Sequence, residues 1–365
     1  MKSFALALTL GGSSVSAMHS WTNVTSSAGG SCVAPGTCTP PTDAKYHAQA
    51  VGPAPGNQWN INGGFCGAWS TQQNALSVGA WISQDLVRKA NRAQTGIAHN
   101  MHGDTKVGYE VMPSNVAYTA ASLKLSYEEW DYMQPAPQAK AFKVWLKKHL
   151  SKGRAIVWFP LCKGDGHDAY PGSAPNGGQC DHVEPMLGIW SKHPLDDATV
   201  YDDDVILHFS DQDTEPYYRP MRTLEDDLTM MGNCKDAGAG FGKNEMYPCF
   251  DQSVTYGLAT TGLNVTGNVH ASLAVDITAE PDVRQFQKAT QIHGTVTAHG
   301  LTAGSTYSIY RYPDTASVPA GPPFAAGASH THKFTATADT FTWADPNTFS
   351  SHSATYYLAA AGKAH

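Results

Sequence analysis

Cys66, His182 and Asp211 are side chains of the types that together support nucleophilic catalysis by a thiol. A thiol attacks only as its thiolate, and the first turn of a helix lowers a thiol pKa through the helix dipole and unpaired amide groups. Cys66 stands directly before a run of helix formers that extends to Val78. The imidazole of His182 titrates in the range that a thiolate partner needs, and the carboxylate of Asp211 can orient it. The sequence therefore predicts a cysteine–histidine–acid site.

The turn around Cys66 is rich in glycine. We expect Gly63, Gly64 and Gly67 to leave room for a substrate carbonyl, and the backbone amide of Cys66 to point toward the oxyanion that forms during attack. This arrangement predicts acyl transfer to the thiol.

Helices and strands must bring these residues together. Helices are expected over 67–78, 83–92 and 137–153. Strands are expected over 154–159, 183–190 and 205–209, so that His182 begins one strand and Asp211 follows the next. Beyond about residue 262, short Thr-, Val- and Tyr-rich runs at 291–298, 305–312 and 353–359 have the spacing of a small β-sandwich.

The segment Gly64-Phe65-Cys66-Gly67-Ala68-Trp69-Ser70 resembles the cysteine motif of the papain-like superfamily. Downstream, the segments 152–157, 181–183 and 204–211 are similar to the peptidase branch of that superfamily that trims double-glycine bacteriocin leaders. The similarity covers about residues 57 to 215. The phrase 300–307 resembles the turn and strand that precede the tyrosine corner of fibronectin type III-like modules.

These resemblances imply an α+β fold with two domains. A papain-like cysteine peptidase domain, with a helical part and an antiparallel sheet, is expected over 57–261, and a fibronectin type III-like sandwich over 262–365. The resemblance implies Cys66 as nucleophile, His182 as base, Asp211 as orienter of the base, and a peptide or protein substrate. The family places an oxyanion-hole glutamine six residues before the cysteine, where this chain has Asn60, and its nearest glutamine is Gln58. Either amide can donate, so both remain candidates.

The N-terminal segment, the cysteines and the sequons indicate a secreted, extracellular protein. Residues 1–17 have the order of a signal peptide, and an irregular arm is expected over 18–56. Seven cysteines are present, so at least one thiol is left over if the others pair. Six fall into sequence-local couples, although six cysteines allow 15 pairings. The couples are Cys32 with Cys38, Cys162 with Cys180, and Cys234 with Cys249. Two sequons, at Asn23 and Asn264, predict a glycoprotein.

Other classes of protein fit the sequence less well. The formal net charge is −7 with scattered basic residues, which argues against a nucleic-acid partner, and no apolar run is long enough to span a membrane. The acidic run 202–204 lacks the ligand spacing of a calcium loop and is expected to be a solvated turn. No cofactor and no metal are expected.

Three alternatives stay open at the level of function. One is acyl transfer of transglutaminase type, another is cleavage of cell-wall amides, and the third is a non-catalytic extracellular binding or wall protein on the same scaffold. For the C-terminal domain, the alternatives are binding of a glycan or a protein and a role as a cap on the catalytic domain.

Overall fold

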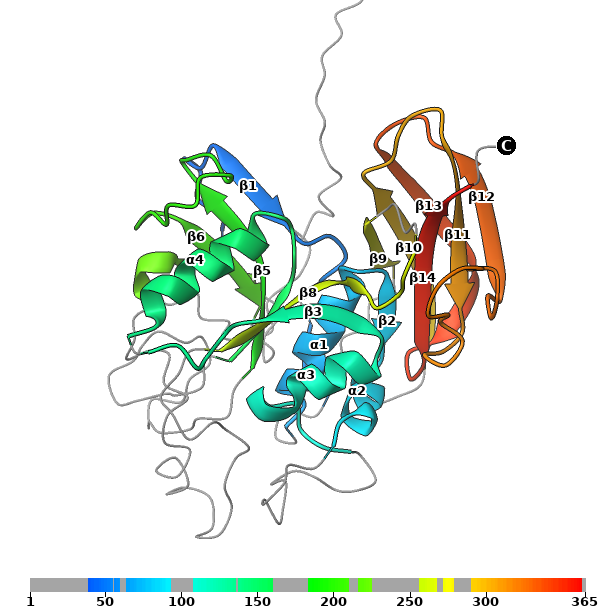
Figure 1. The fold of residues 1–365 in the computed structure, drawn as a ribbon, viewed down its shortest axis with the longest axis horizontal. Coiled ribbons are helices and arrows are strands. Elements are labelled where there is room, and N and C mark those ends of the chain that lie inside the picture. Colours follow the sequence, from blue (N-terminus) through cyan, green and yellow to red (C-terminus); the bar gives the residue numbers. More distant parts are fainter. Residues whose placement is uncertain are drawn as a thin grey trace, which may run out of the picture.

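The protein has a mixed α+β fold built from antiparallel sheets with few helices (Figure 1). The computed structural model describes residues 39–54, 56–59, 64–92, 108–135, 137–159, 183–209, 216–224, 256–267, 272–278 and 290–362. His182 and Asp211, Asn60, and the six cysteines other than Cys66 lie outside these residues, as do residues 1–38.

The largest sheet contains seven strands in the order β3-β8-β4-β5-β6-β7, with β1 paired to β5 beyond this path. Its strands are β1 (Tyr46–Gln49), β3 (Leu125–Glu129), β4 (Ile156–Trp158), β5 (Glu184–Ser191), β6 (Val205–Phe209), β7 (Pro216–Pro220) and β8 (Gly257–Leu263). The predicted strand at 205–209 coincides with β6. The predicted strands at 154–159 and 183–190 correspond to β4 and β5 within two residues.

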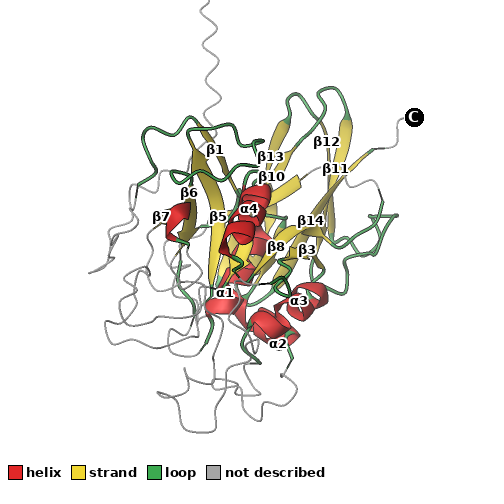
Figure 2. Ribbon diagram, turned by 60° about the vertical axis from the view of Figure 1, so that its left-hand side comes forward, coloured by secondary structure: helices red, strands yellow, loops and turns green. Residues whose placement is uncertain are grey.

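Helices cover both faces of this sheet. The helices are α1 (Cys66–Leu76), α2 (Gln84–Ala90), α3 (Pro113–Ser122) and α4 (Ala139–Leu150). α4 lies on one face of the sheet and α1 on the other (Figure 2). Phe142, Leu146 and Leu150 of α4 pack with residues of β4, β5 and β6. Trp69 of α1 packs with other residues of β5 and β6. Because α1 lies inside the molecule, all of its residues are buried, and it lacks the polar face of a surface helix.

The C-terminal part forms two smaller sheets that face each other. One has the order β13-β10-β9 and the other the order β12-β11-β14-β2. The strands are β2 (Ala80–Ile82), β9 (Ser272–Thr278), β10 (Gln291–His299), β11 (Thr306–Tyr312), β12 (His330–Thr335), β13 (Thr340–Ser350) and β14 (Ala354–Ala361). Buried residues of both sheets, among them Val296 of β10, Ile309 of β11 and Tyr357 of β14, form one apolar cluster.

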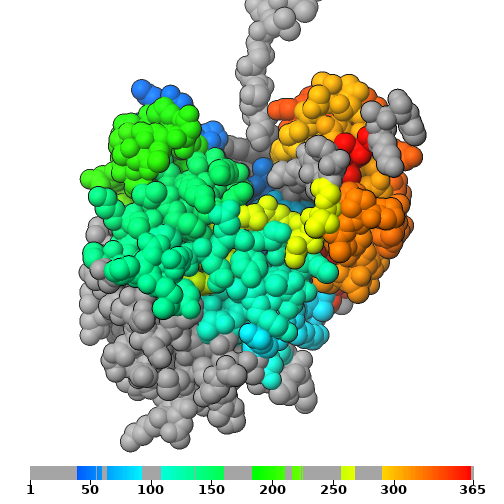
Figure 3. Space-filling view, in the orientation of Figure 1, coloured from blue at the N-terminus to red at the C-terminus, as the bar shows by residue number. Residues whose placement is uncertain are grey.

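The edge strand β2 comes from the N-terminal half of the chain. It pairs antiparallel with β14, with Ala80 opposite Tyr356 and Ile82 opposite Ala354. The predicted domain boundary at 261/262 falls inside β8, so the last two residues of that strand belong to the segment assigned to the second domain. In the space-filling view, the orange C-terminal strands adjoin the cyan and yellow segments (Figure 3).

The arm at 18–56, expected to be irregular, contains β1. Its four residues pair with the second half of β5, Tyr46 opposite Ser191 and Gln49 opposite Gly188. The sequence Tyr-His-Ala-Gln is only four residues long, which is too short for a periodic pattern to identify a strand, and it contains no Val, Ile or Leu. Its pairing depends on the neighbouring strand.

The segment 300–307 is closed by a hydrogen bond from the backbone to a side chain. The backbone N–H of Thr302 donates to the hydroxyl of Tyr307 at 3.0 Å. Gly304, in the turn between them, has a φ of +82°, which favours glycine. No helix among the described residues combines the length and the apolar character that crossing a membrane requires.

Candidate active site

Cys66 is the first residue of α1, as the sequence predicts. It is a thiol and is 6% exposed. Phe65 precedes the helix as its N-cap residue and carries no side-chain oxygen, so no side-chain cap satisfies the first amides. The partial positive charge of this helix end acts on Cys66 in favour of the thiolate, whereas burial of the thiol in an apolar cluster acts in the opposite direction.

Gln58 lies beside the start of α1. Its side-chain oxygen Oε1 accepts a hydrogen bond from the backbone N–H of Phe65 at 3.0 Å, and the side chain is buried. Because the oxygen is used as the acceptor, the Nε2 group is the end of the amide that can donate to an oxyanion. The structure thus brings one of the two candidate amides to Cys66, while Asn60 lies outside the described residues.

The glycines next to Cys66 serve a different purpose from the predicted one. A Cβ at Gly64 would lie 1.7 Å from Oε1 of Glu110, and a Cβ at Gly67 would lie 2.2 Å from the carbonyl oxygen of Val111. The space at both positions is filled by the protein itself. The expectation that Gly64 and Gly67 leave room for a substrate is wrong, because they allow the segment before α3 to pack against α1.

Arg88 of α2 stabilises this turn through hydrogen bonds. This role was not predicted. Arg88 is fully buried and donates hydrogen bonds to the carbonyl oxygens of Gly64 and, at 3.2 Å, of Gly108. Its guanidinium carbon also lies 4.5 Å from the centre of the Phe65 ring. The only signal in the sequence is that Arg88 follows Gln84 by four residues, which places both on one face of α2. In the structure both side chains are buried.

The structure brings the start of β5 to α1. Ser70, one helical turn after Cys66, donates from Oγ to the carbonyl oxygen of Val183 at 3.1 Å, and both residues are buried. Val183 belongs to the same apolar cluster as Cys66. Val183 directly follows His182 in the sequence.

The end of β6 lies at the same end of the sheet. β5 and β6 are antiparallel neighbours in which Met186 is opposite His208, and Trp190 is opposite Val205. The first residue of β5 and the last residue of β6 therefore adjoin. Phe209, the last residue of β6, packs with Trp69 of α1 and lies two positions before Asp211.

A second histidine–carboxylate pair lies between these strands and was missed by the sequence analysis. Nδ1 of His208 is 2.6 Å from Oε2 of Glu184, and both side chains are completely buried. The rings of Trp158 and Tyr217 stand edge-on to the His208 ring at 5.7 and 4.7 Å. The signal available in the sequence was one ionisable residue inside each of two apolar strands.

His208 faces away from Cys66. Its neighbours Leu207 and Phe209 pack with Trp69 of α1, whereas Ile206 packs with residues of α4. Because successive side chains of a strand point to opposite faces, His208 lies on the α4 face of the sheet. It is therefore not the partner of Cys66.

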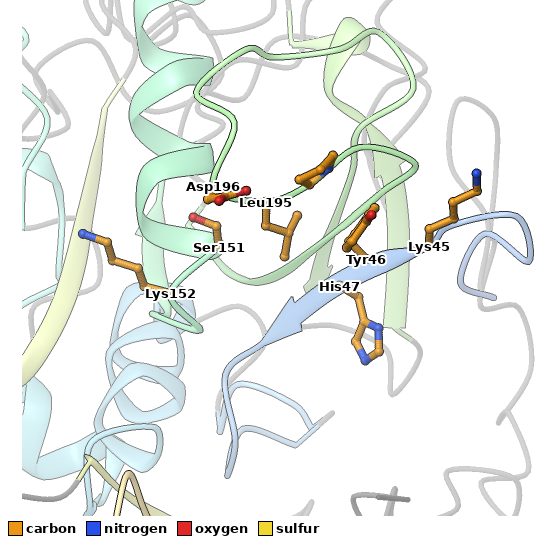
Figure 4. A pocket seen from close by; sticks show the side chains of 8 residues that line it. Lys45, Tyr46, His47, Ser151, Lys152, Leu195 and Asp196 are labelled. Carbon is orange, nitrogen blue, oxygen red and sulfur yellow. The ribbon is translucent and has the colours of Figure 1, made fainter. Parts of the chain in front are cut away.

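A pocket lies beside β1 at the surface of the large sheet. It has a volume of about 650 Å³ and is lined by residues of β1, of the turn after α4 and of the segment 194–196. Lys45 and Lys152 project away from each other on opposite sides of it (Figure 4). Neither Cys66 nor Gln58, the two predicted site residues that the structure describes, lines it.

The described residues contain no group of three or more histidine, cysteine, aspartate or glutamate side chains that could hold a metal ion. Asp204, expected in a solvated acidic turn, is instead completely buried and accepts a hydrogen bond from Nζ of Lys147 at 2.9 Å. The neighbouring residue Asp202 is exposed, in agreement with the expected turn.

Comparison of the chain with protein-family models, with curated proteins and with solved structures finds no match.

Proposed function

We propose that this protein is a cysteine hydrolase that cleaves an amide bond, with a peptide or protein as substrate. Cys66 is the nucleophile, His182 the base and Asp211 the residue that orients His182. The observation that carries the proposal is the junction at α1, where Cys66 begins a buried helix, Gln58 is fixed beside it, and Ser70 binds the residue that follows His182.

The proposed reaction has two stages. The Cys66 thiolate attacks the substrate carbonyl carbon, and the oxyanion is stabilised by the Cys66 amide and the Gln58 side chain. The carbon–nitrogen bond then breaks, and protonated His182 gives its proton to the leaving amine. His182 next removes a proton from water, which attacks the thioester and releases the acid and the thiolate. If an amine replaces this water, the same site performs acyl transfer.

We propose further that the fold is papain-like, with a fibronectin type III-like sandwich at its C-terminus. The antiparallel sheet covered by α1 and α4 supports the first part. The two facing sheets and the Tyr307 hydrogen bond support the second, in which β2 completes one sheet from outside the C-terminal segment.

We also propose that the protein is secreted, with three disulfides among the cysteines other than Cys66. The described sequon supports passage through a secretory route, because the Asn264 side chain is exposed directly after β8. On treatment with an N-glycosidase, the mass decrease of the secreted protein should be smaller by one glycan in Asn264→Gln than in wild type, which tests glycosylation at this position.

The experiment that tests the hydrolase proposal follows acylation by p-nitrophenyl acetate. The expected result is release of one equivalent of nitrophenol in a burst, with the acetyl group on the peptide containing Cys66, and no burst in Cys66→Ala. Absence of a burst, or acetylation at other positions only, would overturn the proposal and favour the non-catalytic binding or wall protein.

A further inference from the structure

We infer that Glu184 and His208 are positioning residues for the proposed site: they fix the register of β5 and β6 at the end of the sheet that continues to His182 and Asp211. This inference rests on the proposed function. Neither residue touches the reacting atoms, because both side chains lie on the face of the sheet opposite Cys66.

The pair occupies the end of the strands that matters for the site. Glu184 is the first residue of β5 and stands two positions after His182, while His208 is the second-last residue of β6 and stands three positions before Asp211. The contact of 2.6 Å joins the two strands directly. The contact therefore links the two strand ends that lead to His182 and Asp211.

Burial makes this contact specific to one register. A slip of β6 by one residue moves His208 to the α1 face, and Glu184 then remains buried on the α4 face without its histidine. A buried carboxyl group that loses its hydrogen-bond partner in the interior is strongly disfavoured. Apolar residues tolerate a slip better, because they make less directional contacts. Setting the register is also the best-attested role of buried polar pairs.

The same strand carries a matched pair at its other end. Asp204 directly precedes β6, and its carboxylate accepts a hydrogen bond from Lys147 of α4 at 2.9 Å, with side chains 0% and 2% exposed. This pair is as buried as Glu184–His208 but fixes the end of β6 that leads away from the site. It provides a control for the general effect of removing a buried pair from β6.

The test measures the alkylation rate of Cys66 by iodoacetamide as a function of pH in the full chain. Glu184→Gln with His208→Leu removes the pair without leaving a buried charge, and Lys147→Met with Asp204→Asn does the same at the other end. An ordinary thiol loses reactivity steadily below its pKa of about 8.5, whereas a thiolate held by an imidazolium stays reactive down to about pH 6.

We expect the Glu184/His208 variant to be alkylated roughly 10- to 100-fold more slowly at about pH 6, with the profile of an ordinary thiol. The Lys147/Asp204 variant keeps the wild-type profile even if its melting temperature falls by the same amount. Equal profiles in wild type and the Glu184/His208 variant would overturn the inference alone. Equal profiles in wild type and His182→Ala would overturn the proposed function and the inference with it. If the Glu184/His208 variant does not fold, the pH profile of Glu184→Gln is measured in its place and compared with wild type in the same way.

Discussion

At Gly67, the segment before α3 packs closely against the helix that begins at Cys66. A methyl group there meets the backbone carbonyl of Val111, which cannot move without shifting the segment before α3. We predict that Gly67→Ala lowers the free energy of unfolding by about 3 kcal/mol through overpacking. Denaturant unfolding measures this change.

Gly304→Ala is the control for Gly67→Ala. A Cβ at Gly304 has no atom within 4 Å, so only its φ of +82° is unfavourable. We expect Gly304→Ala to lower the free energy of unfolding by about 1 kcal/mol. Equal costs at the two positions would contradict the close packing at Gly67.

His149 is a buried histidine of α4 that is held neutral. Nη1 of Arg154 is 3.2 Å from Nδ1 of His149, and because a guanidinium can only donate, Nδ1 must be the unprotonated nitrogen. Burial lowers the pKa of His149 from 6.5 to about 4, although the nearby Glu128 carboxylate opposes this shift.

This pKa predicts acid destabilisation in a defined range. Between about pH 6.5 and 4 the unfolded chain binds a proton at His149 that the folded protein does not, so the free energy of unfolding falls as the pH falls. Across this pH range, His149 lowers the free energy of unfolding by an amount on the order of 3 kcal/mol. Urea unfolding at several pH values measures it, and His149→Gln should flatten the curve. A wild-type curve that is flat between pH 6.5 and 4 would show that His149 does not titrate as expected.

At the scale of residues, the sequence predicted the features that depend on residues nearby in the chain. The position of Cys66 at a helix start follows from the run of helix formers after it. Gln58 was kept as a candidate because of its type and position. Arg88, Glu184 and His208 were missed, because their partners lie on other elements and the spacing of residues within one segment contains no information about them.

At the scale of elements, the contact between α1 and the start of β5 is central to the account. Ser70→Ala removes the hydroxyl that donates to the carbonyl oxygen of Val183 and leaves that buried oxygen without this bond. We predict a loss of about 1 to 3 kcal/mol in unfolding free energy, together with slower alkylation of Cys66. Thermal melting and labelling kinetics measure the two effects.

Thr71→Val provides the matched variant in the same helix. The hydroxyl of Thr71 donates only within α1, to the carbonyl oxygen of Gly67 at 2.8 Å. This substitution should leave the alkylation rate of Cys66 unchanged. If Ser70→Ala and Thr71→Val slow alkylation equally, the contact with β5 has no special role.

Elements with a strong periodic pattern were predicted, and those that depend on their neighbours were not. α4 has apolar residues at helical spacing, and β6 is a short apolar run bounded by polar residues, so both were found. β2 has three residues and exists through its pairing with β14. α3 begins with Pro113 at its first position and was also missed, because Ala, Ser, Thr and Asn give it no clear apolar stripe.

At the scale of the whole molecule, the two halves share one core. Cys66 belongs to the same apolar cluster as Tyr312, Tyr356 and Leu358 from the C-terminal sheet. The hydroxyl of Tyr356 also donates to the carbonyl oxygen of Leu123 at 3.1 Å. The expectation of a separable C-terminal domain did not include these contacts, because a sequence pattern does not reveal contacts between distant segments.

We predict that a fragment ending at Gly267, which keeps β8 intact, does not fold by itself. It lacks the partner strand of β2 and the C-terminal side chains that cover α1. Calorimetry should show no cooperative transition, and Cys66 should react as an exposed, ordinary thiol. Cooperative melting of this fragment would show that the C-terminal strands are dispensable for the fold around Cys66.

The rate constant for alkylation of Cys66 shows whether His182 activates its thiol. The purified protein is labelled with iodoacetamide near neutral pH and the labelled peptides are mapped, in parallel with His182→Ala. We expect fast, selective alkylation of Cys66 that slows markedly in the variant. A Cys66 found in a disulfide, or one that reacts at the same rate in both proteins, would contradict it.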